Sequence, residues 1–287
     1  MNLPTYLEKH YTPGTAKVYL QEINHYLGSY PGAARAVYTD VAGYIGALRT
    51  RYGNPSTLNR IVCSLKAYYD YLCDSGQRED NPAKSIRLRD QRSRDIQLQD
   101  LLVTEELEAL LHRPERYSNL AGRNKVLMSL LIYQALYPVE MEGLRVGDIN
   151  LEAGTVHITA TARTNGRELA LKPNQILLFY QYIREARVTL LGRGSSDALL
   201  IGHRGQPMPA QDITKHVKRI GKGLYPGRMV NAQTIRQSVI AELLKQGHDV
   251  SIVQGFAGHR YPSTTERYRQ SEIETLQAAV QKYHPFG

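Results

Sequence analysis

Strand patterns are confined to one short stretch of this 287-residue chain, between residues 155 and 171. Residues 155–159 and 167–171 flank a turn that contains Asn165-Gly166, a dipeptide typical of hairpins. Elsewhere the apolar residues recur at helical spacing. The sequence therefore predicts a mainly α fold (class α+β) that carries one small antiparallel β-sheet.

Residues 1–85 are expected to form a small helical domain. Apolar stripes at helical spacing follow Thr12-Pro13, Thr39-Asp40 and Asn54-Pro55, each of which is suited to a helix start. Asn81-Pro82 closes the last stripe, because proline disfavours helical geometry in the residue before it.

Residues 86–103 are expected to form a basic linker. Five basic residues and one acidic residue lie between Lys84 and Arg94, with little apolar content. A second domain is expected over residues 104–287, with a helix that starts near Thr104 and a buried apolar helix at 126–137. Further helices are expected at 174–191, 210–221, 232–247 and 250–257, followed by a tail helix at 271–283.

The charge balance favours an anionic partner. The chain has 36 Lys and Arg against 27 Asp and Glu, a formal net charge of +9. Nucleic acid is the usual partner of such a chain, and a merely basic protein is the alternative. We expect a cytoplasmic protein, because neither an 18-residue apolar run nor a secretion signal occurs.

Cysteine usage fits a reducing compartment. Cys63 and Cys73 lie ten residues apart in one predicted helix. That spacing separates them by about 15 Å, too far for a disulfide. Cysteines and histidines nowhere show zinc-site spacing, so we predict neither a metal nor a cofactor.

Three residues near the C-terminus suit the cleavage of DNA by a tyrosine. His259 precedes Tyr268 by nine residues, and Arg236 lies upstream in an amphipathic helix pattern. A phenol, with a pKa of ~10, needs help to lose its proton before it attacks a phosphate. Arginine and histidine donors stabilise the charge that gathers on the phosphate oxygens, so no metal is required. The alternative for each residue is an ordinary structural or surface role.

These residues resemble the C-terminal part of the tyrosine recombinase (phage integrase) family. Gly258-His259 and Thr264-Thr265-x-x-Tyr268 match that family's Gly-His and Thr-Thr-x-x-Tyr segments, and Arg236 matches its His-x-x-Arg motif. The resemblance implies an N-terminal core-binding domain and a C-terminal catalytic domain that clamp double-stranded DNA. It also implies a 3′-phosphotyrosine on Tyr268, with Arg236 as phosphate clamp and His259 as donor or proton carrier.

Two positions lack the residue that the family pattern has. Tyr137 stands where that pattern has its first catalytic arginine, in register with Glu140. A phenol offers one hydrogen bond in place of a bidentate cationic fork, and the loss of one such donor costs on the order of 10²–10³ in rate. Gln233 replaces the histidine of His-x-x-Arg, so it can donate to a phosphate but cannot carry a proton.

A third position changes the expected general acid. Arg163 stands at the hairpin position where the family keeps a lysine, and Lys172 is another basic residue nearby. A guanidinium holds its proton too tightly to act as an acid. Arg145, about two helical turns past Tyr137 if the helix continues, and Arg123 are possible substitute cations. The alternative for both is a structural or solvated arginine.

Two functional hypotheses follow. The first is a site-specific recombinase or integrase that acts as a dimer or tetramer on DNA, with type IB topoisomerase activity as a minor variant. The second is a catalytically weak or inactive DNA-binding relative that assists a partner recombinase, which Tyr137 and Gln233 favour. Under the first hypothesis, segment 271–283 would dock on a neighbouring protomer, and the alternative is that it packs on its own domain.

Overall fold

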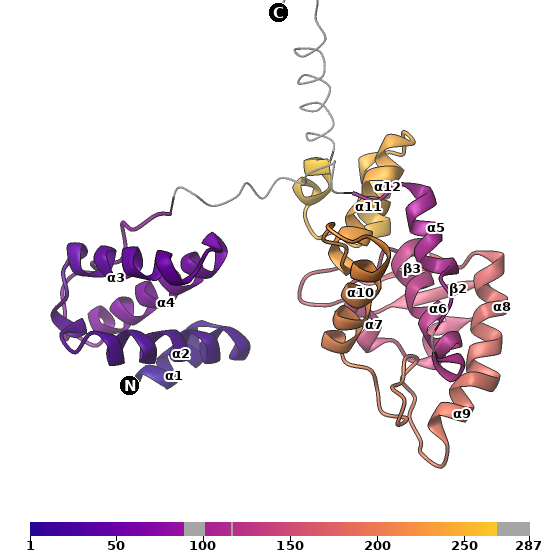
Figure 1. Cartoon of the computed structure of the whole chain (residues 1–287), viewed down its shortest axis with the longest axis horizontal. Coiled ribbons are helices and arrows are strands. Elements are labelled where there is room, and N and C mark those ends of the chain that lie inside the picture. The colour runs from indigo at the N-terminus through magenta and orange to yellow at the C-terminus, as the bar shows by residue number, and fades with distance from the viewer. Residues whose placement is uncertain (89–100, 116, 269–287) are drawn as a thin grey trace, which may run out of the picture. The chain divides into compact units, whose positions relative to one another are not determined.

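The chain folds into two compact units, Met1–Arg94 and Asp95–Gly287. A computed structural model describes residues 1–88, 101–115 and 117–268. Figure 1 shows an all-helical first unit and a second unit that carries a small sheet. The observed class is therefore the predicted one, mainly α with a small antiparallel sheet.

In its described residues, 1–88, the first unit has four α-helices and one short 3-10 helix. Its long helix α4 contacts the other three α-helices. Two buried tyrosines lie in this core: the hydroxyls of Tyr26 and Tyr69 are 2.7 Å apart, and Tyr69 also donates to the Ala33 carbonyl at 2.9 Å. Asn54 caps α4 as expected, by accepting from the Ser56 amide at 2.9 Å. The elements are α1 (Leu3–His10), α2 (Pro13–Ser29), η1 (Ala33–Arg35), α3 (Tyr38–Arg51) and α4 (Pro55–Asp74).

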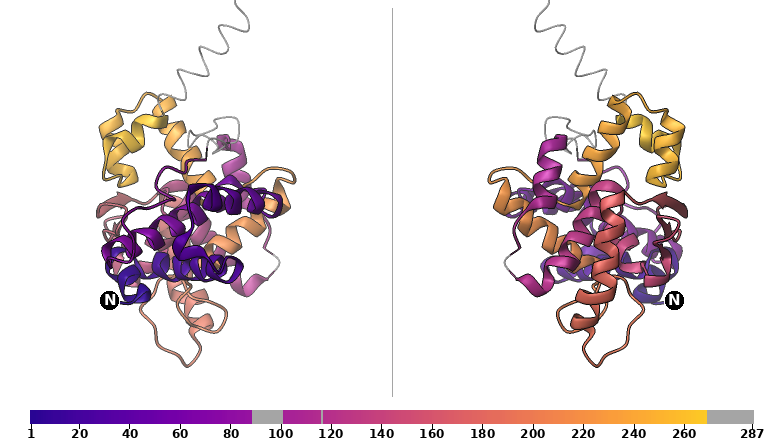
Figure 2. Two further views of the ribbon diagram at one scale, coloured as in Figure 1. Left: turned by 90° about the vertical axis from the view of Figure 1, so that its left-hand side faces the viewer. Right: turned by 90° about the vertical axis from the view of Figure 1, so that its right-hand side faces the viewer.

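The second unit has a three-stranded antiparallel sheet in the order β1-β2-β3, in which Ile158 pairs with Arg167. Figure 2 shows the sheet along one side of the unit, and α6 is buried over most of its length. The strands are β1 (Ile149–Asn150), β2 (Thr155–Ile158) and β3 (Arg167–Ala170). The α-helices with both ends in the described residues are α5 (Thr104–His112), α6 (Ser118–Tyr133), α7 (Pro138–Gly143), α8 (Pro173–Gln181), α9 (Arg187–Leu191), α10 (Ala210–Leu224), α11 (Ala232–Lys245) and α12 (Val250–Ala257), with a 3-10 helix η3 (Val146–Asp148) and a π-helix η4 (Tyr182–Ala186) between them.

The helix predicted over 126–137 is too long at its C-terminal end. Helix α6 stops at Tyr133, Ala135 has a φ of +50°, and Pro138 begins the new helix α7. A left-handed residue followed by a proline ends one helix and starts the next. Arg145 is therefore not two helical turns beyond Tyr137 on one continuous helix.

The hairpin agrees with its prediction. Residues 159–166 connect β2 to β3 and contain Asn165-Gly166. The Asn165 amide donates to the Gly258 carbonyl at 2.9 Å, which draws the connection toward the predicted catalytic segment. The short strand β1 was not predicted, because two residues show no alternation.

Cys63 and Cys73 both lie in α4 and are free thiols. Within the described ranges, no helix is long and apolar enough to cross a membrane. The tail segment 271–283 and most of the linker 86–103 lie outside the described residues.

Candidate active site

Helix α11 carries Arg236 into the interior of the second unit. Asn231 caps this helix by accepting from the amides of Gln233 and Thr234, at 2.8 and 3.1 Å. Arg236, in the second turn, is fully buried. Its guanidinium donates to the Ala135 carbonyl and, at 2.6 Å, to the Ala257 carbonyl. These two bonds fix the guanidinium between the turn after α6 and the end of α12.

Tyr137 packs directly on that guanidinium. The Arg236 carbon Cζ lies 4.0 Å from the centroid of the Tyr137 ring, which is a close cation–π contact. Burial lowers the pKa of Arg236, and the neighbouring Tyr137 and Glu140 counter that effect. Tyr137, which stands in place of the expected arginine, therefore lies at the site and contacts Arg236.

His259 and Tyr268 pack together beside Arg236. Their rings are stacked, with centroids 6.5 Å apart and planes inclined by 15°. His259 Nδ1 lies 2.8 Å from the hydroxyl of the buried Thr265, and Nε2 has no partner within the described protein. Burial, and then the charges of Arg236 and Arg167, lower the pKa of His259 to about 4.

Tyr268 is 6% exposed and is the last residue that the structure describes. Burial raises the pKa of its phenol to about 12, although the nearby Arg236 acts in the opposite direction. A phenol with so high a pKa is a poor nucleophile in this state. To act as a nucleophile, this phenol would require a base, together with the electrostatic change that a bound phosphate would bring.

Arg167 is a buried cation that the sequence patterns did not single out as a site residue. Its Nη1 donates to Glu140 Oε1 at 2.7 Å, and its Nε donates to the Phe256 carbonyl at 2.7 Å. Glu140 also accepts from the Thr164 hydroxyl at 2.7 Å. Burial opposes ionisation of Glu140, but Arg167 outweighs it and holds the carboxyl pKa below its ordinary value. Glu140 could have indicated this residue from the sequence. A carboxylate that is expected to be buried requires a cation as partner, and Arg167 is one of the nearby candidates.

The three altered positions meet at one groove. Tyr137, Arg163 and Gln233 all line a cavity of about 790 Å³ at the start of α7 and α10. Arg163 and Gln233 are exposed, so both are available to a ligand in this groove. Lys172, in contrast, lies at the start of α8 and borders a different, mainly apolar cavity.

Neither predicted substitute cation joins this group. The exposed Arg145 pairs with Asp197 at 2.8 Å. Arg123 is buried elsewhere and donates to Asn124 Oδ1 and to the Ile201 carbonyl. Both arginines lie away from Arg236, whereas Arg167, although paired with Glu140, is close enough to Arg236 to lower its pKa.

We expect Gly258→Ala to disturb this cluster. Gly258 has a φ of +68°, and a Cβ built there would overlap the Arg167 guanidinium. Backbone strain and the clash together should lower the free energy of unfolding by about 1–3 kcal/mol, which denaturant unfolding would measure. Gly255→Ala, a change inside helix α12 with open space around the Cβ, should leave the free energy of unfolding unchanged or raise it by up to about 1 kcal/mol, because alanine favours a helix more than glycine does. Equal losses in the two variants would contradict the clash.

We expect the free energy of unfolding to fall in mild acid because of two buried histidines, His216 and His259. Burial, reinforced by nearby arginines, holds the pKa of each at about 4. A free histidine titrates near ~6.5, so between pH ~6.5 and ~4 the unfolded chain binds protons that the folded chain does not. The free energy of unfolding should therefore fall as the pH drops through this range and level off below it, by up to about 3 kcal/mol for each histidine. Urea unfolding at several pH values measures this slope, and His259→Phe should flatten it.

Comparison with known proteins places the chain in a family. Residues 101–274 match the pattern described as the phage integrase family. The tyrosine recombinase XerD of Listeria innocua is 25% identical over 97% of this chain and 95% of its own length. The tyrosine recombinase XerD of Pseudomonas aeruginosa is 28% identical over 98% of this chain and 95% of its own length. The crystal structure of the XerH site-specific recombinase bound to a palindromic difH substrate covers 93% of this chain and 78% of its own, with a TM-score of 0.71 and 20% identity. Since the family pattern spans more than half of the sequence, the chain belongs to the phage integrase family of tyrosine recombinases.

Proposed function

We propose that this protein is a site-specific DNA recombinase that breaks and rejoins double-stranded DNA through a 3′-phosphotyrosine on Tyr268. The observation that carries the proposal is the single buried cluster formed by Arg236, His259 and Tyr268. The relatives are named as tyrosine recombinases, and XerH is bound to a DNA substrate. Their similarity supports the same chemistry here.

In the proposed cleavage step, the Tyr268 oxygen bonds to phosphorus and the bond from phosphorus to the 5′ oxygen breaks. His259 is neutral near pH 7 because its pKa is about 4. When its Nδ1 donates to Thr265, Nε2 holds the free electron pair that can accept the phenol proton. Since Gln233 cannot supply a proton and Arg163 is a poor acid, we assign protonation of the leaving 5′ oxygen to the His259 imidazolium, which passes on the proton it took from Tyr268 through a water molecule. Attack by a 5′ hydroxyl on the phosphotyrosine reverses the step and rejoins the strand.

Cations around the cluster would stabilise the charge on the phosphate. Arg236 has five N–H groups, of which two donate to the Ala135 and Ala257 carbonyls, and Nε has no partner in the described part of the chain. Arg167 adds a second buried guanidinium, and Arg163 and Gln233 add donors at the mouth of the groove. This set supports transition-state stabilisation without the arginine that Tyr137 replaces.

The surrounding surface suits a DNA backbone. Between residues 163 and 228 there are twelve Lys or Arg against four Asp or Glu. Such an excess favours phosphate contacts, which set affinity and registration on the duplex rather than base specificity. In this proposal the first unit holds the duplex as a core-binding domain, the second unit performs the chemistry, and the protein acts in the cytoplasm on the nucleoid.

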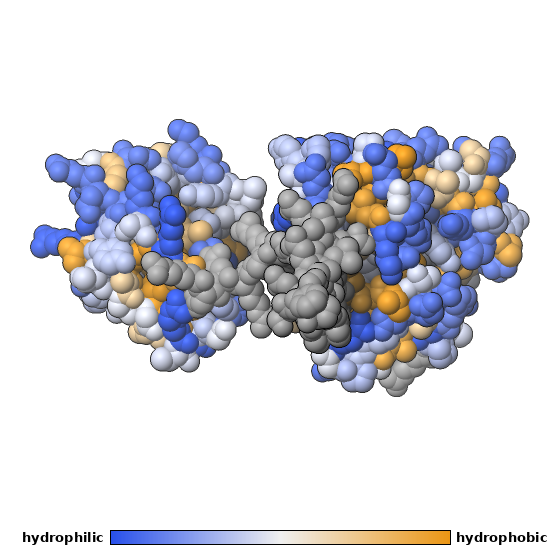
Figure 3. Space-filling view, turned by 90° about the horizontal axis from the view of Figure 1, so that it is seen from above, coloured by the Kyte–Doolittle hydropathy of each residue, from blue (hydrophilic) through white to orange (hydrophobic). Residues whose placement is uncertain are grey.

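We also propose that recombination requires several copies on DNA, as a dimer or tetramer. A mainly apolar cavity of about 440 Å³ is lined by Leu107, Val239, Leu243 and Phe256. Figure 3 shows hydrophobic side chains gathered in patches on the visible face of the second unit. Segment 271–283, with Ile273, Leu276 and Val280 among its apolar residues, is the occupant that we assign to this cavity on a neighbouring copy.

The second candidate is a DNA-binding relative that assists a partner recombinase. The Tyr137 contact favours it, because the ring lies against the guanidinium that the phosphate must reach. The buried and raised-pKa phenol of Tyr268 also fits a resting or inactive site.

A two-site assay separates the candidates. Fragments that the protein binds are first selected from a genomic library, and two labelled DNA molecules carrying that site are then incubated with it. Recombinant products support the recombinase. Tight binding without products, which turns into products only when a second recombinase is added, would establish the assisting role.

A further inference from the structure

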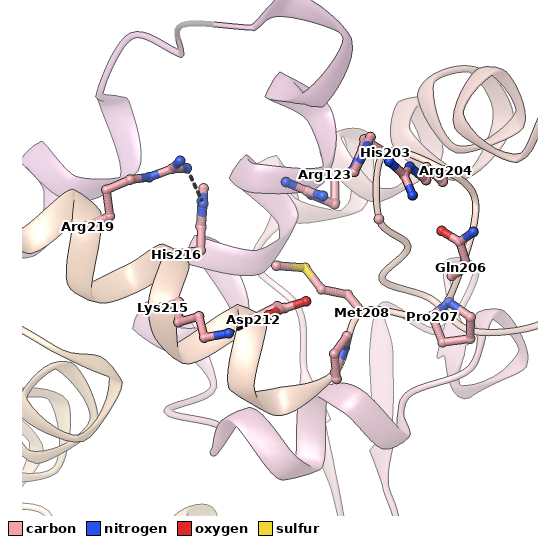
Figure 4. A pocket seen from close by; sticks show the side chains of 12 residues that line it. Arg123, His203, Arg204, Gln206, Pro207, Met208, Asp212, Lys215, His216 and Arg219 are labelled. Atoms are coloured by element: carbon pink, nitrogen blue, oxygen red, sulfur yellow. Dashed lines mark hydrogen bonds and ion pairs between the residues drawn. The ribbon is translucent and has the colours of Figure 1, made fainter.

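A basic pocket lies between α6, α10 and the connection that precedes α10. Lys215 is the residue that lines both this pocket and the groove formed by Tyr137, Arg163 and Gln233. The pocket has a volume of about 560 Å³. Figure 4 shows the Arg123 side chain extending from α6 toward His216, which is hydrogen-bonded to Arg219. One carboxylate, that of Asp212, lines the pocket, and it lies 3.3 Å from Lys215 Nζ. The basic side chains of this pocket are Arg123, His203, Arg204, Lys215, His216 and Arg219.

The hydrogen bond to Arg219 fixes the tautomer of His216. Arg219 Nη2 lies 3.0 Å from His216 Nδ1. A guanidinium only donates, so Nδ1 accepts and the proton of the neutral ring lies on Nε2. His216 is 6% exposed, and among the described residues Nε2 has no hydrogen-bond partner. A buried N–H group without an acceptor is costly, and here it lies in the wall of a cationic pocket.

Arg123 has no direct ion-pair partner among the described residues, and the carboxylate of Glu115 reaches it only through Asn124, which donates to Glu115 at 2.8 Å. Arg123 is 6% exposed, and it donates to Asn124 Oδ1 at 2.6 and 3.0 Å and to the Ile201 carbonyl at 3.3 Å. Both acceptors are neutral. Across the ranges that the structure describes, no carboxylate pairs with this guanidinium. A buried cation held only by neutral groups gains most from an anion.

We propose that this pocket binds a phosphate-type oxyanion between the Arg123 guanidinium and the Nε2–H group of His216, with Arg219 holding the imidazole in its donating tautomer. One oxyanion supplies both the direct ion-pair partner that Arg123 lacks and the acceptor that His216 lacks. The phosphate can belong to a free small molecule or to the DNA backbone. Because binding of free phosphate is measured without DNA, the inference does not depend on the proposed strand transfer.

The charges around His216 agree with this arrangement. Burial, and then Arg123 and Arg219, lower the pKa of His216 to about 4, with Glu115 opposing and Arg113 reinforcing the shift. The ring is therefore neutral near pH 7 and has one N–H to offer. A bound anion would raise this pKa, because it favours the imidazolium. The ring signals of His216 should report occupancy directly.

The test is an NMR titration of the full chain labelled with ¹⁵N-histidine. Inorganic phosphate is added at constant ionic strength against sodium chloride, and His216→Phe identifies the His216 ring signals. We expect a saturable shift of these signals with phosphate and none with chloride. Arg123→Met and Arg219→Gln should each weaken binding about ten- to a hundredfold, as expected for the loss of a charged hydrogen bond. Lys218→Gln, the neighbouring exposed position on α10 that does not line the pocket, should leave it unchanged.

Short duplex DNA in phosphate-free buffer forms the second arm. A shift of the His216 signals with DNA but not with phosphate, lost in Arg219→Gln, would identify the backbone as the source of the oxyanion. No response to either ligand would overturn the proposal, as would equal responses in the Arg219→Gln and Lys218→Gln proteins. Arg219 is exposed, so its replacement keeps the test valid even where loss of the buried Arg123 prevents folding.

Discussion

Tyr268→Phe is expected to abolish covalent attachment of the protein to DNA. Phenylalanine keeps the ring that packs on His259 but removes the oxygen that would bond to phosphorus. Removal of a covalent nucleophile reduces rates by a factor on the order of 10⁴–10⁶. A nicked suicide substrate that carries the bound site traps the adduct, which is then counted on a denaturing gel. DNA affinity should change by less than about twofold, because the phenol contributes little to binding the backbone.

Tyr261→Phe is the matched control for this variant. It removes a hydroxyl from the same segment, but its side chain is 69% exposed and lies outside the stacked pair. It should form adduct at the native rate. An adduct that survives in Tyr268→Phe would assign the nucleophile to another tyrosine. No adduct in the native protein, on a site that it binds tightly, would leave only the DNA-binding role.

Local patterns predicted the elements well where side-chain spacing decides the structure. Helix α12 occupies residues 250–257 as expected, and β2 and β3 fall inside the predicted strands. The prediction was wrong at residues 134–137, where apolar content continues but the backbone turns. The φ of +50° at Ala135 could not be predicted from the local sequence, because alanine favours helices.

The predicted site residues could be named from motifs, but their surroundings depend on tertiary contacts. The Ala135 carbonyl that holds Arg236 lies 101 positions away in the sequence. The ion pair between Arg167 and Glu140 likewise joins a strand to a separate helix. The spacing of apolar residues along the sequence does not indicate contacts between residues that lie so far apart in the chain. The sequence patterns therefore miss the cation beside Arg236 and offer Arg145 and Arg123 in its place.

Tyr137→Arg is expected to raise the rate of adduct formation by a factor on the order of 10²–10³, the gain that corresponds to restoring one preorganised charged donor. Position 137 caps α7, and its amide donates to Glu140 Oε2 at 2.8 Å, so the backbone there is already fixed by a hydrogen bond. An arginine would bring a bidentate fork to the groove that Gln233 and Arg163 line. The change also frees the Arg236 guanidinium from the ring that now lies 4.0 Å from it.

This gain should depend on where the charge is placed. Val139→Arg adds the same charge to the same groove from an exposed position, so it tests general attraction of DNA. It should tighten binding at low salt and leave the single-turnover rate of bound complexes within about threefold, because backbone affinity acts equally before and at the transition state. Equal rate gains in both variants would mean that the gain comes from general attraction of DNA to an added charge. A slower Tyr137→Arg enzyme would show that the ring on Arg236 serves catalysis and that Arg167 already supplies the second cation.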